Sequence, residues 1–313
     1  MHTWIVSDGA AGNELQALAA AQALGAAAPR VLRLRARLPW RWLAPQWAPV
    51  LDADDWLPPL PTQDYPRLAV GAGRVGAAVL LSIKRLSPAT RTLQILAPRV
   101  ATQRYDAVLV PRHDGLSGDR VVSIDGSVHA IDDAWLTRER AAMPDPPPGP
   151  RTLVLIGGPR RGVRIDAACW SLLAQRLQHW HAEEGGSALI VGSRRTPASW
   201  RQALGALQAP WLRHWFDAAD GANPYRSALA WADRVVVSAD SVNMLSEAMA
   251  TGRPVYALQR GLASGKIGRF HACMQDSGRL QALGDLREPA PYPPLRELAR
   301  VRAQLQALLF ASD

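Results

Sequence analysis

The stretch RVVVSADSVNMLSEAMATGRPVYAL, residues 234–258, predicts a buried strand, a polar turn, a helix and a second strand. Its valine run at 235–237 is continuous, as in parallel strands that are covered on both faces. Gly252 and Pro254 are typical of a helix end that is followed by a new strand. The stretch therefore predicts a strand–helix–strand unit, the building block of an α/β fold.

The turn of this unit carries polar side chains at the carboxyl end of the first strand. Ser238, Asp240 and Ser241 precede the predicted helix, whose N-terminus favours phosphate through free amides and a partial positive charge. Glu247 follows about two turns into the helix, where its carboxylate can accept hydrogen bonds from ribose hydroxyls. The alternative is that Ser241 only caps the helix and that Glu247 is solvated.

Residues 241–254 fit the pattern Ser-x5-Glu-Ala-x3-Gly-x-Pro. This pattern resembles the donor-binding segment of GT-B glycosyltransferases, which include the enzyme that adds N-acetylglucosamine to lipid-linked peptidoglycan precursors. The resemblance implies a nucleotide-sugar site that includes Asn243 together with the residues of the turn.

The length and composition are those of a globular protein with two domains. The chain has 313 residues, of which 48% are hydrophobic and 20% are charged. It contains no run of about 18 apolar residues, and its amino end lacks the features of a signal peptide. Cys169 and Cys273 are isolated, so we expect neither a metal site nor a disulfide. We expect a cytoplasmic protein, either soluble or peripheral at the inner face of the membrane.

The positive charge of the chain comes almost entirely from arginine. The formal net charge is +9, and Lys84 and Lys266 are the only lysines in the sequence. Arginine binds phosphate through two parallel hydrogen bonds and attracts anionic lipid headgroups. We therefore expect an acidic ligand or a membrane surface as partner. The sequence has no helix-turn-helix, zinc-finger or aromatic ribonucleoprotein motif, so we do not expect nucleic acid.

Two series of alternating strands and helices predict two Rossmann-like domains whose parallel sheets face a cleft. The expected strands are 4–6, 31–34, 68–70, 93–96, 107–110, 153–156, 188–191 and 211–215, and the expected helices are 14–24, 75–86, 166–181, 197–207, 223–231 and 294–310. The proline-rich segment 143–150 predicts a linker between domains of residues 1–142 and 151–313. The last helix can pack back on the amino-terminal domain, as tail helices of GT-B proteins often do.

Motifs distributed over the whole chain resemble the mitochondrial-fission ELM-type family, whose members occur in plants and widely in bacteria. The motifs are at 7–16, 71–74, 111–115, 156–159, 193–197, 223–225, 238–247 and 266–271. Asn13 departs from the pattern, because the family usually has histidine there and an amide cannot transfer a proton. The resemblance implies a GT-B-like fold, whereas the plant members are described as fission factors rather than as enzymes.

Further loops of the carboxyl-terminal half are candidates for binding the donor diphosphate. They contain Gly157, Gly158 and Arg160 after one predicted strand and Ser193, Arg194 and Arg195 after the next. The glycines allow close approach of a ligand, and the arginines either pair with phosphate or are solvated. Thr196, before Pro197, is expected to cap the following helix. Lys266, with Arg269 and His271, offers a cation that can neutralise a leaving diphosphate.

The candidates for a catalytic base lie in the amino-terminal half. His113 and Asp114 follow a predicted strand, and inverting sugar transfer needs a base that takes the proton of the acceptor hydroxyl. Asp8 and Glu14, after the first strand, are alternative bases. His113 is equally well explained as a loop histidine bound to backbone, and Asp8 as part of a tight structural turn. GT-B enzymes typically work without a metal, so we expect no cofactor besides the donor.

Residues 71–76 fit the pattern G-x-G-x-x-G after a strand and before a helix, as in nicotinamide-binding folds. The acidic ribose ligand expected about 20 residues later is missing, because residues 91–98 read RTLQILAP. We therefore do not expect an oxidoreductase or an epimerase. Arg74 is better placed to meet an acidic acceptor or to cap a loop.

Residues 35–47, followed by Trp56, combine arginines with tryptophans, a composition suited to the headgroup region of a membrane. Peripheral attachment near a lipid-linked or envelope glycan acceptor would follow. The alternative is that the tryptophans pack a long loop, since prolines interrupt the segment.

Together the motifs predict a metal-independent GT-B-like glycosyltransferase that moves a sugar from a nucleotide sugar to a cell-envelope acceptor. In this interpretation Glu247 holds the ribose, the loops of the second domain hold the diphosphate, and His113 or Asp114 activates the acceptor. The alternative is a non-catalytic GT-B-like scaffold that recruits a membrane-remodelling partner, an interpretation that Asn13 keeps open.

Overall fold

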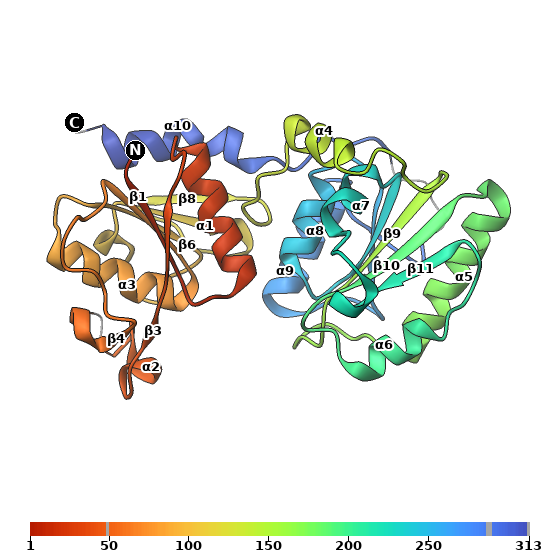
Figure 1. The fold of residues 1–313 in the computed structure, drawn as a ribbon, viewed down its shortest axis with the longest axis horizontal. Coiled ribbons are helices and arrows are strands. Elements are labelled where there is room, and N and C mark those ends of the chain that lie inside the picture. The colour runs from red at the N-terminus through yellow and green to blue at the C-terminus, as the bar shows by residue number, and fades with distance from the viewer. Residues whose placement is uncertain (48–49, 286–289, 312–313) are drawn as a thin grey trace. The chain divides into compact units, whose positions relative to one another are not determined.

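The computed structural model of the chain describes residues 1–47, 50–285 and 290–311 (Figure 1). The chain divides into two compact units. Unit 1 comprises Met1–Ala130 together with Arg296–Asp313, and unit 2 comprises Ile131–Leu295. Each unit has its own parallel sheet and its own hydrophobic core.

The described part of unit 1 is built on a sheet of six parallel strands in the order β2-β1-β5-β6-β7-β8. The strands are β1 (Thr3–Ser7), β2 (Arg30–Arg33), β5 (Leu68–Ala72), β6 (Arg91–Ile95), β7 (Ala107–Pro111) and β8 (Val121–Ile124). The helices α1 (Ala11–Ala23) and α10 (Glu297–Phe310) cover one face, and α3 (Gly73–Leu86) covers the other.

Side chains alternate between the two faces of this sheet, as the pleat of a strand requires. In β1, Ile5 packs in the cluster with α1 and α10, whereas Trp4 and Val6 pack in the cluster with α3. All three side chains are buried, which explains why the strand reads as one apolar run.

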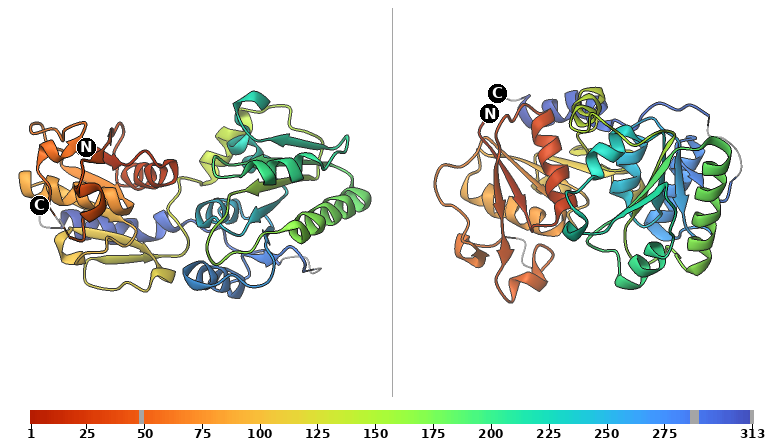
Figure 2. Two further views of the ribbon diagram at one scale, coloured as in Figure 1. Left: turned by 90° about the horizontal axis from the view of Figure 1, so that it is seen from below. Right: turned by 45° about the vertical axis from the view of Figure 1, so that its right-hand side comes forward.

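A small lobe interrupts unit 1 between β2 and β5 and lies outside the main sheet. It contains the antiparallel pair β3 (Arg35–Ala36) and β4 (Trp56–Leu57) and the single-turn helix α2 (Trp40–Leu43). We call its described residues, 35–47 and 50–57, the tryptophan lobe. Figures 1 and 2 show it in orange-red, projecting from the body of unit 1.

The described part of unit 2 has a second sheet of six parallel strands, in the order β11-β10-β9-β12-β13-β14. Its strands are β9 (Arg151–Ile156), β10 (Ser187–Gly192), β11 (Leu212–Trp215), β12 (Arg234–Ser238), β13 (Val255–Leu258) and β14 (Gln281–Ala282). Its helices are α4 (Asp133–Ala141), α5 (Ala167–Glu184), α6 (Ala198–Gly205), α7 (Tyr225–Trp231), α8 (Val242–Met249) and α9 (Gly265–Asp276).

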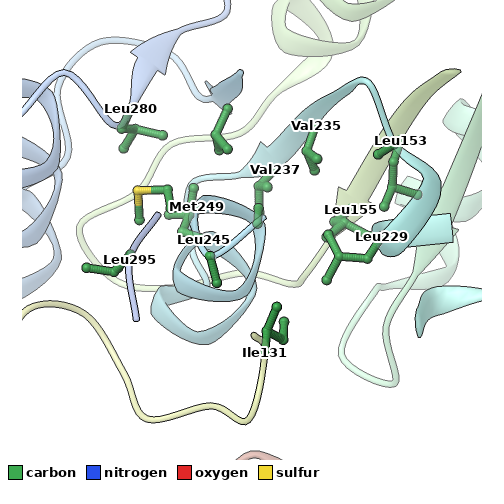
Figure 3. Packing of buried hydrophobic residues seen from close by; sticks show 14 of the residues in the cluster. Ile131, Leu153, Leu155, Leu229, Val235, Val237, Leu245, Met249, Leu280 and Leu295 are labelled. Carbon is green, nitrogen blue, oxygen red and sulfur yellow. The ribbon is translucent and has the colours of Figure 1, made fainter. Parts of the chain in front are cut away.

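The valine run of β12 is buried on both faces, as predicted. Val235 and Val237 pack with α4, α7, α8 and α9, and Val236 packs on the opposite face with α5 and α6. Figure 3 shows Leu245 and Met249 of α8 close to the valines on the first face. The strand–helix–strand unit predicted from residues 234–258 is therefore confirmed.

The two predicted parallel-sheet domains and the return of the last helix to the amino-terminal one are confirmed. The sequence patterns missed β8, β14, α4 and α9. Short edge strands and the weakly periodic α4 give little signal, whereas residues of α9 were considered only as a source of cations. The contact boundary lies after Ala130 rather than at 143–150, because Trp135 and Leu136 of α4 join the core of unit 2. The proline-rich segment lies within unit 2.

No helix within residues 1–47, 50–285 and 290–311 is both long and apolar enough to cross a bilayer.

The last helix completes the core of unit 1, so truncating its buried face should destabilise that unit. Leu305 is 1% exposed and belongs to the hydrophobic cluster in which α10 meets α1, β6, β7 and β8. We expect Leu305→Ala to lower the free energy of unfolding by about 2–5 kcal/mol through lost burial and a cavity. Gln304→Ala, at an exposed position of the same helix, should change it by about 0.5 kcal/mol or less. Chemical denaturation measures both values, and equal effects would contradict the assignment of α10 to this core.

Candidate functional site

The order of strands in unit 2 reverses between β9 and β12. From β9 the chain continues outward to β10 and β11, and after α7 it returns to β12 on the other side and continues to β13 and β14. In open α/β sheets, ligands bind at the carboxyl ends of the strands at such a switch point. The loops after β9, β10 and β12 meet there, and they contain most of the predicted donor-site residues.

The carboxylate of Asp240 links all three loops. It is completely buried and accepts hydrogen bonds from the Gly158 amide at 3.0 Å, the Ser238 hydroxyl at 2.6 Å and Arg195 Nη2 at 2.7 Å. The Ser238 hydroxyl in turn accepts from the Gly157 amide at 2.7 Å. A buried charge is stable only when paired and hydrogen-bonded, and this network supplies both conditions.

The two glycines are required by this network. A Cβ atom on Gly157 would lie 2.2 Å from Asp240 Oδ2, and one on Gly158 would lie 2.3 Å from the carbonyl oxygen of Arg195. The sequence analysis explained these glycines by the approach of a ligand. In the structure, the approach of the neighbouring loops already requires them.

Thr196 does not cap a helix, so that expectation was wrong. Its hydroxyl lies 2.9 Å and 2.7 Å from the carbonyl oxygens of Ile156 and Gly157, and it accepts from the Ser193 amide at 2.8 Å. The N-cap residue of α6 is Pro197, which has no side-chain oxygen. Thr196 instead joins the loop after β10 to the end of β9, and Ser193 is part of the same contact.

Exposed cations surround this buried network. Arg160 donates to the carbonyl oxygen of Asp240 at 2.8 Å, and the side chain of Arg195 is 51% exposed although it also binds the buried carboxylate. Arg194 is exposed in the loop after β10. A pocket of about 260 Å³ lies beside the loop after β9 and is lined by Gly158, Pro159, Arg160, Arg161, Val163, Ile165 and Trp200.

The N-terminus of α9 adjoins the same loop. The Ser264 amide donates to the carbonyl oxygen of Gly162 at 2.8 Å, two residues before Lys266. Lys266 and Arg269 are exposed on α9, so both can meet an anion. The described end of the sheet therefore combines a helix N-terminus and several cations, a combination that attracts phosphate groups.

His271 is buried, so the cation expected from this segment would come from Lys266 or Arg269. His271 is 3% exposed, and neither ring nitrogen has a hydrogen-bond partner among the described residues that meets standard geometry. Burial, and to a smaller extent Arg160, lower its pKa to about 4, while the Ala239 backbone and Asp240 oppose the change.

Glu247 is held by a residue that the sequence analysis did not include in the site. Tyr225, the first residue of α7, donates its hydroxyl to Glu247 Oε2. Burial raises the pKa of Glu247, while Tyr225 and Arg226 oppose the rise. The pair fixes the orientation of a carboxylate that is half-buried in α8. The motif at 223–225 was the sequence signal that could have identified Tyr225.

Two other predicted residues lie at the start of α8. Ser241 caps the helix, since its hydroxyl accepts from the Met244 amide at 3.3 Å. Asn243 is half-buried in the first turn. The alternative role of Ser241 as a helix cap is therefore confirmed.

The base candidates of unit 1 do not lie together. His113 and Asp114 are in a short 3-10 segment, Arg112–Asp114, directly after β7. Asp8 is exposed after β1, and its Oδ1 accepts from the Ala10 amide at 2.9 Å. Since β5 and β6 lie between β1 and β7, the strand ends are roughly 14 Å apart. Asp8 therefore cannot share one acceptor hydroxyl with His113 or Asp114.

Glu14 is a weak candidate for a base. It forms two hydrogen bonds with Arg33, at 2.7 Å and 2.9 Å. The Arg33 guanidinium holds the pKa of Glu14 below its usual range. A carboxylate stabilised in this way has little tendency to take a proton.

The switch point of unit 1 lies between β1 and β5. The amide of Asn13 would lie 2.9 Å from a Cβ atom on Gly73, so Asn13 packs at this point. The glycines of the G-x-G-x-x-G pattern have a packing role, because a Cβ atom on Gly71 would lie 2.9 Å from Gly76 Cα. Asp8 and Arg74 line a pocket of about 370 Å³ that extends to the tryptophan lobe.

Among the described residues, no group of three His, Cys, Asp or Glu side chains could hold a metal ion. Asp52 and Asp54 have Asp-x-Asp spacing, but Asp52 is the N-cap of a 3-10 turn and pairs with Arg85.

Comparison with known proteins identifies the family. The family model described as mitochondrial fission ELM1 matches residues 11–309. The chain belongs to the mitochondrial fission ELM1 family. The mitochondrial fission protein ELM1 of Arabidopsis thaliana is 31% identical over 279 residues, which cover 78% of this chain and 65% of that protein. This ELM1-family chain therefore spans less than two thirds of the length of its plant relative.

Solved structures resemble the ELM1-family chain in fold at low sequence identity. The UDP-GlcNAc 2-epimerase of Methanocaldococcus jannaschii in complex with UDP-GlcNAc and UDP has a TM-score of 0.51 at 10% identity, over 98% of this chain and 99% of that one. Spinosyn forosaminyltransferase has a TM-score of 0.51 at 16% identity, over 99% and 90% of the two chains. These similarities show that the fold is GT-B-like.

Removing the Asp240 carboxylate should destabilise unit 2. In Asp240→Ala the buried Gly158 amide and Ser238 hydroxyl lose their acceptor, and Arg195 loses its partner. We expect a loss of about 3–5 kcal/mol in the free energy of unfolding. Asp240→Asn keeps the shape of the side chain and one acceptor oxygen, so its free energy of unfolding should fall by less than that of Asp240→Ala. Chemical denaturation provides the test, and a wild-type stability of Asp240→Ala would contradict the role of this network.

The neutral, buried His271 should make the protein less stable in acid. Its pKa is lower in the folded state, so the unfolded state binds the proton first, and stability falls as the pH drops from about 6.5 to about 4. The difference between these two pKa values corresponds to about 3 kcal/mol. His271→Leu should lack this part of the pH dependence, whereas losses due to other groups remain. Denaturation curves at pH 7 and pH 4 measure the difference, and equal acid sensitivity of both proteins would exclude the assignment.

Proposed function

We propose that unit 2 binds a nucleotide sugar at the carboxyl ends of β9 and β12 and that the protein transfers the sugar to an acceptor. The observation that carries the proposal is the meeting of exposed cations and the N-terminus of α9 at the switch point of the sheet. The UDP-GlcNAc 2-epimerase with the similar fold is described in complex with UDP-GlcNAc and UDP, which supports the choice of ligand class.

In the proposed complex the diphosphate lies against the loop after β9 and the start of α9. Arg160, Arg194 and Lys266 supply positive charge from three different segments. The Asp240 network keeps these loops in place before the ligand arrives, so less conformational entropy is lost on binding. The buried carboxylate is already neutralised by Arg195, which limits its repulsion of a phosphate.

Glu247 and Tyr225 are the proposed contacts of the ribose. A carboxylate oriented by a tyrosine hydroxyl can accept from one ribose hydroxyl, and the tyrosine oxygen can accept from a second. Because burial raises the pKa of Glu247, the carboxylate takes up a proton at higher pH than an exposed glutamate. As the pH falls, binding of the nucleotide sugar should therefore weaken at a higher pH than the one at which exposed carboxylates take up protons.

His113 and Asp114 remain the proposed bases for transfer. Both are half-buried after β7 and lie in one turn of chain, so either can reach the same hydroxyl. In the transfer step, the base takes the hydroxyl proton as the acceptor oxygen bonds to the anomeric carbon. As this bond forms, the bond between that carbon and the diphosphate breaks, and Lys266 or Arg160 stabilises the diphosphate that leaves.

A non-catalytic scaffold is the second candidate function, and Asn13 favours it. The amide packs against Gly73 at the switch point of unit 1 and cannot act as a base. The plant relative is named as a mitochondrial fission protein, a name that refers to a cellular process and not to a reaction. A scaffold would keep its partner after Glu247→Gln, whereas an enzyme would lose donor binding and turnover.

Calorimetric titration of UDP, ADP, GDP and dTDP and of their sugar esters tests the donor site. We expect one nucleotide to bind, with a dissociation constant about tenfold or more weaker in Glu247→Gln, because a charge-assisted hydrogen bond is lost. Lys266→Gln should weaken binding less and reduce its salt dependence. Arg213→Gln, an exposed charge change on β11, is the control and should bind like wild type. If no nucleotide binds the wild-type protein, the donor site is refuted and the scaffold is favoured.

A further inference from the structure

The tryptophan lobe exposes an unusual share of the large apolar side chains of the protein. Seven such side chains are exposed among the described residues, and four of them belong to this one lobe. They are Leu38 at 71%, Trp42 at 70%, Trp47 at 75% and Leu57 at 44% exposure. Scattered apolar residues on a surface need no explanation, whereas a group from one short segment indicates an interaction surface.

The tryptophans of the lobe divide into two sets. Trp56 is completely buried, and Trp40 is half-buried with its Nε1 donating to Asp55 at 2.8 Å. These two attach the lobe to the body of unit 1, as the packing alternative in the sequence analysis required. Trp42 and Trp47 are mostly exposed and do not take part in that attachment. The packing of the lobe on unit 1 therefore does not explain why tryptophan is present at these two positions.

Arginines accompany the exposed side chains. Arg35, Arg37 and Arg41 are exposed, and residues 35–47 contain no acidic residue. The three acids of the lobe follow at 52–55. Asp52 pairs with Arg85, Asp55 binds Trp40, and Asp54 is exposed. The part of the lobe that carries Trp42 and Trp47 is therefore basic as well as apolar.

We propose that the tryptophan lobe docks on an anionic lipid surface, with Trp42 and Trp47 inserted at headgroup depth and Arg35 and Arg41 facing lipid phosphates. Tryptophan prefers this depth because its ring is apolar and its N–H can bond to water or headgroups. Arginine is attracted by the negative surface potential of anionic lipids. A protein partner could bind the apolar side chains, but it would need a surface of complementary shape. A lipid surface needs no such shape and offers groups that bind both the tryptophans and the arginines.

Co-sedimentation with vesicles tests this proposal on the full-length protein. The vesicles consist of phosphatidylcholine alone or with about 30% phosphatidylglycerol. Wild type should bind the anionic vesicles and be released by salt. The double variant Trp42→Ala/Trp47→Ala should bind the vesicles at least about tenfold more weakly, since two inserted side chains are lost. Arg35→Gln/Arg41→Gln should lose roughly fivefold per charge and most of the salt dependence.

Leu262→Ala is the matched control, because Leu262 is 89% exposed in unit 2, outside the lobe. It should bind vesicles like wild type. Single variants Trp42→Ala and Trp47→Ala, whose melting temperatures should match wild type, separate loss of binding from loss of folding. Wild-type vesicle binding by the lobe variants, or equal binding to neutral vesicles, would overturn the proposal. So would a wild-type dimer that the tryptophan substitutions dissociate without any vesicle binding, which would assign the lobe to a second copy of the chain.

Discussion

The buried carboxylate of Asp240 is the contact on which the arrangement of the loops in unit 2 depends. It joins the end of β12 to the loops after β9 and β10, and it does so only because residues 157 and 158 have no side chains. An unpaired charge at this depth would cost several kcal/mol. The loops therefore keep one relative position, and the cations that they carry are presented to solvent in a fixed pattern.

In this arrangement, one set of residues holds the loops together and another set presents positive charge to solvent. Ser238, Asp240 and Thr196 are buried and hold the loops, whereas Arg160, Arg194 and Lys266 are exposed beside them. Arg195 belongs to both groups, since its guanidinium is half exposed while it binds the buried carboxylate. A site organised in this way can bind an anion without first ordering its own backbone, and it needs only modest charge at the surface.

The sequence predicted the fold well because the signals for buried parallel strands are strong. Residues 234–258 identified β12, α8 and β13, and the glycine-containing loops were correctly placed at strand ends. The roles within the site were less predictable. The local sequence around Asp240 would be the same whether its carboxylate bound neighbouring loops or a ligand. Only the contacts with Arg195 and Gly158 in the folded chain show that it binds the loops. By contrast, the helical spacing of Ile267, Phe270 and Met274 does place His271 on the buried face of α9, but the sequence analysis considered it only as a polar candidate.

The membership of α10 in unit 1 has a consequence for biosynthesis. Val301, Leu305 and Leu309 belong to the same cluster as Ile5 of β1, and the whole of unit 2 lies between them in the chain. During translation, β1 leaves the ribosome early, but the helix that covers its cluster emerges only after unit 2 has been made. The second unit can therefore finish folding before the first, which reverses the usual order for nascent proteins. Until then, the part of the first sheet that α10 covers remains exposed to solvent.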